Sequence, residues 1–86
     1  MRVTVQLFAR LKELAGRTDV ACEVPAGATI HDVWQAVAGR YPALAPYASS
    51  VSCAKNEDFA RMSSPVGEGD AIAFLPPVSG GASGRS

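Results

Sequence analysis

The sequence contains few of the residues from which metal sites and disulfide frameworks are built. Among its 86 residues it has two cysteines, Cys22 and Cys53, and one histidine, His31. Neither cysteine belongs to a Cys-x-x-Cys pair or lies near the histidine in sequence, which argues against a zinc site. We expect both cysteines to be small buried core residues rather than a disulfide, and His31 to be a solvated residue of a first helical turn.

Long apolar runs and an excess of one charge are also absent. Polar residues such as Arg2, Gln6 and Arg10 interrupt the N-terminal segment, so we expect no signal peptide, no membrane span and a cytoplasmic location. Eight basic residues balance eight acidic ones without forming a basic stripe, so nucleic acid is not an expected partner.

Catalytic and cofactor-binding motifs are missing as well. No serine or cysteine stands in a motif with a base, and the spacing of the acidic residues matches no calcium loop. We therefore expect a chain that binds no metal and no cofactor and that has no catalytic pocket of its own.

The apolar residues that are present predict the elements of the N-terminal half. Strands with one buried face are predicted over residues 3–8, where apolar and polar residues alternate through the first five positions, and over residues 18–24, where they alternate again. Helical spacing predicts a short helix over residues 9–15 that ends at Gly16. A second apolar stripe predicts the main helix over residues 30–39.

The start of the main helix is better marked than its end. Thr29 offers a hydroxyl N-cap, and Asp32 stands at the third helical position, where its charge favours the helix dipole. Gly39 and Pro42 are predicted to end the helix. Residues 42–50 are expected to be a loop with no regular structure beyond a turn.

The C-terminal half is predicted to contain short strands over residues 51–55, 59–62 and 71–75, separated by turns over 56–58 and 67–70. The turns carry acidic side chains that we expect to hydrogen-bond the local backbone. These residues are Glu57, Asp58, Glu68 and Asp70.

This element order predicts an α+β fold that fits the β-grasp arrangement. Its mixed sheet has the main helix packed across one face and a short helix after the first strand. In the β-grasp arrangement the first and last strands lie side by side in the middle of the sheet, a pairing that periodicity alone does not require. The predicted domain comprises residues 1–78, and residues 79–86, with no apolar residue larger than alanine, form a predicted flexible tail.

The segment that leads from the last strand into the tail, called the tail root below, begins with two stiff prolines and is followed by two small glycines. Pro76 and Pro77 hold an extended direction and reduce the entropy lost on docking. Gly80 and Gly81 lack a β-carbon, so the walls of a partner's narrow site can approach the backbone closely. A mobile C-terminus without such a role explains the glycines equally well when they are considered alone.

Four segments together decide between these interpretations, because they resemble the small subunits of molybdopterin synthase, a family of ubiquitin-like sulfur carriers. The resemblance covers residues 1–81. The segments are Leu7–Gly16, Asn56–Phe59, Pro65–Asp70 and Phe74–Gly81.

The resemblance implies chemistry on the carboxylate of Gly81, with Gly80 beside it. An E1-like adenylating enzyme would activate the carboxylate with ATP and magnesium, and a sulfur donor would convert it to a thiocarboxylate. The large subunit of the synthase would receive the tail and pass the sulfur to the pterin precursor in molybdenum cofactor biosynthesis. The chain would thus be the non-catalytic, sulfur-donating subunit of a sulfurtransferase.

The resemblance also implies a docking surface near the tail root. Phe59 and Leu75 are candidates for an exposed apolar patch, although core packing of both is equally compatible with the sequence. Alternation along the last strand places Phe74 and Leu75 on opposite faces. The partner's channel would contact the tail itself, at Pro76, Pro77, Val78 and Ser79.

Residues 82–86 depart from the family pattern, in which the second glycine ends the chain. With Gly81 in a peptide bond, no carboxylate is free for adenylation. The extension is a precursor segment removed by a protease, a remnant of cloning, or a natural variant without carrier activity. Two other functions stay open: a ubiquitin-like modifier joined to lysines, and a sulfur carrier for thiazole or cysteine synthesis.

Overall fold

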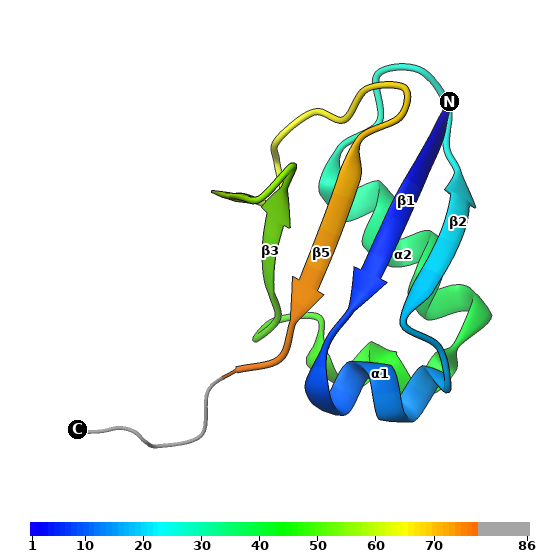
Figure 1. Cartoon of the computed structure of the whole chain (residues 1–86), viewed down its shortest axis with the longest axis vertical. Helices are drawn as coiled ribbons and strands as arrows, with labels where there is room; N and C mark the ends of the chain where they lie inside the picture. Colours follow the sequence, from blue (N-terminus) through cyan, green and yellow to red (C-terminus); the bar gives the residue numbers. More distant parts are fainter. Residues whose placement is uncertain (78–86) are drawn as a thin grey trace.

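The computed structural model describes residues 1–77, so that Val78 and the predicted tail lie outside the described residues (Figure 1). The element order agrees with the sequence prediction, with one additional short helix. The elements are β1 (Arg2–Leu7), α1 (Ala9–Ala15), β2 (Asp19–Glu23), α2 (Ile30–Arg40), η1 (Pro42–Tyr47), β3 (Ser52–Lys55), β4 (Asp58–Ala60) and β5 (Ala71–Leu75).

The strands form one mixed sheet with the order β2-β1-β5-β3-β4. β1 and β5 run parallel to each other, and the remaining neighbours are antiparallel. α2 crosses behind the sheet and α1 lies at its lower end in Figure 1. The predicted α+β fold is therefore confirmed, including the central pairing of the first and last strands.

The start of α2 is fixed by a reciprocal capping box. The Thr29 side chain accepts a hydrogen bond from the Asp32 N–H (3.4 Å), and the Asp32 carboxylate accepts one from the Thr29 N–H (2.9 Å). The Thr29 N–H, followed by the Thr29 hydroxyl (3.2 Å), donates to the Asp32 carboxylate and lowers its pKa from the usual value. The predicted N-cap is confirmed. It fixes the first residue of α2, Ile30, which is also the first buried residue of the apolar stripe of that helix.

Replacing Thr29 by alanine should lower the free energy of unfolding by about 1 kcal/mol, because the N–H of Asp32 loses its partner. Urea denaturation followed by circular dichroism measures the change. Thr29→Ser retains the hydroxyl and serves as the matched control, with an unfolding midpoint close to that of the wild type. Equal loss in both variants would show that the hydroxyl contributes nothing.

The core lies between α2 and the sheet. Trp34 of α2 packs edge-on against Phe74 of β5 with ring centroids 4.9 Å apart. Cys22 and Cys53 are free, buried thiols, as predicted, and burial raises the pKa of both. His31 is exposed on the first turn of α2, also as predicted.

Two boundary predictions are wrong. α2 continues one residue beyond Gly39, to Arg40, because the helical bonding runs on to the Tyr41 N–H, which donates to the Val37 carbonyl (2.9 Å). Residues 42–47, expected to be irregular, form η1. A proline at the start of a helix lacks only an N–H that has no helical partner, and the fully buried Leu44 holds η1 against the core.

The remaining differences concern strand ends. β1 begins and ends one residue earlier than predicted, and β4 covers Asp58–Ala60 rather than residues 59–62. The turn before β4 therefore has only two central residues, Asn56 and Glu57. No helix within residues 1–77 is both long and apolar enough to cross a bilayer.

Candidate partner-binding face

The last strand separates a core residue from an outward-facing one at the root of the tail. Phe74 is fully buried on the α2 side, whereas the next residue, Leu75, is half-buried on the opposite face of the sheet. Pro76 is half-buried and Pro77 is exposed. The predicted alternation is confirmed, and the interpretation of Leu75 as a core residue is wrong.

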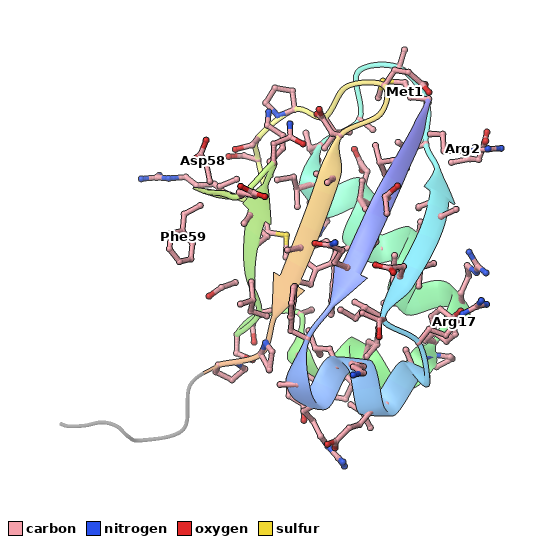
Figure 2. The ribbon with its side chains drawn as sticks, viewed as in Figure 1. Met1, Arg2, Arg17, Asp58 and Phe59 are labelled. Atoms are coloured by element: carbon pink, nitrogen blue, oxygen red, sulfur yellow. The ribbon has the colours of Figure 1, made fainter. Side chains whose placement is uncertain are left out.

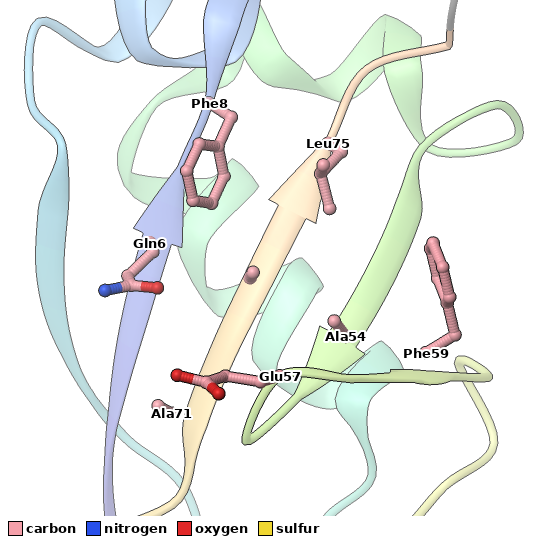
Figure 3. A pocket seen from close by; sticks show the side chains of 8 residues that line it. Gln6, Phe8, Ala54, Glu57, Phe59, Ala71 and Leu75 are labelled. Carbon is pink, nitrogen blue, oxygen red and sulfur yellow. The ribbon is translucent and has the colours of Figure 1, made fainter.

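Cross-strand pairing lines up small side chains on this outer face. Gln6 pairs with Ala73, Ala73 with Ala54, and Ala54 with Phe59, so the row crosses β1, β5, β3 and β4. Alanines on the central strands keep the floor of the face low, while larger side chains stand around it. The result is a shallow groove of about 320 Å³ (Figure 3). The open-face groove is lined by Gln6, Phe8, Ala54, Glu57, Phe59, Ala71, Ala73 and Leu75.

Two aromatic side chains at this groove are unusually accessible. Phe59 is 87% exposed and Phe8 is 41% exposed. Phe59 projects from β4 away from the body of the domain in Figure 2. The interpretation of Phe59 as a core residue is therefore wrong. Covering a phenylalanine with apolar partner atoms contributes about 1.5–3 kcal/mol, so this face favours association with another molecule.

Phe8 was not among the residues predicted to bind a partner, but the sequence contains a signal for it. Leu7 and Phe8 are consecutive apolar residues at the end of an alternating strand, and neighbouring strand residues point to opposite faces. Since Leu7 is fully buried, Phe8 lies on the other side. The Phe8 N–H donates to the Phe74 carbonyl (3.3 Å), which places Phe8 beside the end of β5.

A polar network holds the β3–β4 turn against the start of β5. The Asn56 N–H donates to the Ala71 carbonyl (2.8 Å), and the Ala71 N–H donates to Asn56 Oδ1 (3.0 Å). Asn56 Nδ2 donates to Asp70 Oδ1 (3.1 Å), and Asp70 Oδ2 accepts from the Gly67 N–H (2.7 Å). Asp70 thus bonds its local backbone, as predicted for the turn carboxylates, and so positions one end of the groove.

These bonds have a consequence for acid stability. The Asn56 side chain, followed by the Gly67 N–H, lowers the pKa of Asp70 below its usual value. A carboxyl whose pKa is lowered on folding stabilises the fold above its unfolded pKa of about 3.9, and this contribution is lost as the pH falls through the folded value.

Asp70→Asn should therefore lower the urea midpoint at pH 7, and its difference from the wild type should shrink steadily as the pH falls from about 5 to about 2. Asp19→Asn is the matched control, because Asp19 is exposed and forms no side-chain hydrogen bond within residues 1–77. A difference that stays constant over that pH range would rule out a role for the Asp70 charge.

The remaining predicted site residues, Val78, Ser79, Gly80 and Gly81, lie outside the described residues. The structure brings Phe59 and Leu75 to one face of the sheet, where both line the open-face groove, and the half-buried Pro76 follows Leu75 directly. His31 belongs to α2, behind the sheet, and takes no part in this face.

The ThiS family matches residues 5–81, which include the groove residues and both glycines. The chain belongs to the ThiS family. As a member, it is a small sulfur carrier with a ubiquitin-like fold, and the resemblance seen in the sequence is confirmed.

Individual relatives share most of their length with this chain. The molybdopterin synthase sulfur carrier subunit of Arabidopsis thaliana is 35% identical over 81 residues, covering 94% of this chain and 84% of that protein. The small archaeal modifier protein 1 of Haloferax volcanii is 33% identical over 84 residues, covering 88% and 97%.

Solved structures agree with the fold. The crystal structure of SAMP1 from Haloferax volcanii superposes with a TM-score of 0.85 at 31% identity, covering 94% of this chain and 100% of that one. A chain from the complex of subunits 1 and 2 of the molybdopterin-converting factor of Helicobacter pylori superposes with a TM-score of 0.67 at 23% identity, covering 94% and 100%, and shares the fold.

Proposed function

We propose that this chain is the sulfur-donating small subunit of a molybdopterin synthase. The observation that supports this most directly is the position of the Pro-Pro-Val-Ser-Gly-Gly segment. In the sequence it follows the central strand β5 immediately, and Leu75, the last residue of that strand, lines the exposed apolar open-face groove. Molybdopterin synthase carrier subunits of plant and bacterial origin, at 35% and 33% identity, are among its relatives.

The proposed chemistry begins at the carboxylate of Gly81 once residues 82–86 have been removed. A carboxylate oxygen attacks the α-phosphate of magnesium-bound ATP on an E1-like adenylating enzyme, which forms an acyl-adenylate and releases pyrophosphate. A sulfide-level sulfur nucleophile supplied by the donor then attacks the acyl carbon, displaces AMP and leaves the thiocarboxylate of Gly81. In the large synthase subunit the thiocarboxylate sulfur attacks the pterin precursor to form a thioester. Water then hydrolyses the acyl–sulfur bond, which leaves the sulfur on the pterin for the dithiolene and returns the Gly81 carboxylate.

In this scheme the chain supplies delivery rather than catalysis. Pro76 and Pro77 stiffen the exit from the sheet, and the glycines allow the tail to enter a narrow site. The open-face groove provides the apolar area that holds the partner while the tail is engaged. Phe59 and Leu75 are the proposed contacts, together with Phe8. We further propose that the activating enzyme, and not this chain, holds ATP and magnesium. The sulfur transfer is proposed to take place in the cytoplasm.

Intact mass spectrometry tests the carrier chemistry. A chain that ends at Gly81 retains every described residue, and it should gain the mass difference between sulfur and oxygen when incubated with the adenylating enzyme, magnesium, ATP and a sulfur source. The chain that ends at Ser86 is the matched control and should not change. If the chain ending at Gly81 gains no sulfur, the proposal fails.

A ubiquitin-like modifier is the second candidate, because the modifier protein of Haloferax volcanii is similar in both sequence and fold. In that case the activated Gly81 would form an isopeptide bond with lysines of other proteins. Gly-Gly remnants on target lysines, found after proteolysis of extracts that express the chain, would distinguish it. A carrier for thiazole or cysteine synthesis would also gain sulfur in the mass-spectrometric assay, but it would not donate that sulfur in a molybdopterin synthase.

A further inference from the structure

Glu57 brings a single negative charge to an otherwise uncharged surface. Among the described residues that line the open-face groove it is the only charged one, and Gln6 is the only other polar one. In Figure 3 its carboxylate lies over the end of the groove near Ala71, while Phe8 and Leu75 stand at the other end. The groove is therefore apolar along its length and acidic at one end.

Within residues 1–77 this carboxylate has no ionic partner. The salt bridges of the described residues join Arg2 to Glu23 and Arg10 to Glu13. Lys55, the nearest basic residue in sequence, donates its Nζ hydrogen bond to the Pro65 carbonyl (2.9 Å). The charge of Glu57 is thus available to a group from another molecule.

The backbone at this position disfavours the residue that occupies it. Asn56 and Glu57 have φ values of 50° and 76°, which are those of a tight hairpin turn with two left-handed residues. Asparagine is well suited to such a turn, but the second position strongly favours glycine, and a longer side chain there is strained. A side chain in a strained backbone conformation is a pointer to function rather than to stability.

We infer that Glu57 determines the specificity of the open-face groove by selecting a partner surface with a lysine or arginine beside an apolar side chain. The apolar side chain packs over the alanine floor between Phe8, Phe59 and Leu75, and the cation pairs with Glu57 at the end of the groove. The inference rests on the proposed function, which makes the large synthase subunit this partner.

Two substitutions separate binding from folding. Glu57→Gln removes the charge at nearly constant size and should leave the melting temperature unchanged. Glu57→Gly removes the side chain and relieves the left-handed strain, so its melting temperature should rise. Both should bind the large subunit about 5- to 10-fold more weakly than the wild type, because each removes a partly desolvated ion pair.

The decisive measurement is the dissociation constant for the large subunit of the same organism, determined by titration calorimetry at low and high salt. Wild-type affinity should fall with salt, and the affinity of Glu57→Gln should fall much less. Asp19→Asn, which makes the same charge change on β2 outside the groove, is the matched control and should behave as the wild type does.

Wild-type affinity and salt dependence in Glu57→Gln would overturn the inference while the proposed function stood. A failure of the proposed function would be seen instead in the wild type, which would gain no sulfur or would not bind the large subunit. A Glu57→Gly variant that bound weakly but also melted at a lower temperature would overturn the argument from strain.

Discussion

Phe59→Ala should weaken binding to the large synthase subunit by about 2 kcal/mol or more, which is about 30-fold, and leave the fold unchanged. Phe59 is 87% exposed, so its ring contributes little to the free domain. An aromatic side chain at the edge of an apolar groove can be buried by a partner, and such residues dominate interface energies. Titration calorimetry measures the loss, and thermal melting shows whether the domain remains intact.

Two comparisons make the Phe59 result specific. Phe59→Leu retains most of the apolar surface and should bind nearly as well as the wild type. Phe8→Ala should weaken binding and also destabilise the domain, because more than half of the Phe8 surface is already covered within the fold. Wild-type affinity in Phe59→Ala would mean that the partner does not cover this face.

Phe74→Ala should cost about 3–5 kcal/mol of stability, since it empties a fully buried ring position in the centre of the sheet. The ring also loses its edge contact with Trp34. Domains of this size have about 5–15 kcal/mol in total, so the variant should lose a large part of its stability and unfold at a much lower urea concentration than the wild type. Urea denaturation at 25 °C gives the difference directly.

Leu75→Ala is the natural comparison, because it truncates the next residue of the same strand on the opposite face. Leu75 is half-buried, so its truncation should cost the fold less than that of Phe74 and should weaken binding of the large subunit instead. Equal destabilisation by the two substitutions would contradict the assignment of the two faces of β5.

The sequence predicted the sheet well because its central strands have one buried face and therefore alternate clearly. The alternation in β1 and the stripe of α2 are direct consequences of packing against each other, and Thr29 marks the start of the helix chemically. Gly39 misled because glycine weakens a helix without ending it when the backbone bonds continue. The two prolines led to the prediction of a loop over residues 42–50, but burial of Leu44 in the core stabilises the short helix η1 there.

The candidate site was only partly predictable. β4 is three residues long, too short for alternation to assign a face to Phe59, so its exposure depends on the pairing of Ala54 with Phe59. The outward position of Phe8 could have been predicted, because Leu7 and Phe8 are two consecutive apolar residues at the end of the alternating segment. Nothing in the sequence indicated that Glu57 lies at the groove. Its position there depends on the left-handed turn and on the hydrogen bonds of Asn56.

The most direct test of the account is a sulfur-transfer assay with the chain ending at Gly81 in its thiocarboxylate form. Mixed with the large subunit and the pterin precursor, it should lose its sulfur, return to the carboxylate mass and yield molybdopterin, and it should retain its sulfur when either component is omitted. Sulfur retained in the complete mixture, or the chain recovered attached to lysines, would contradict the assignment as a synthase subunit.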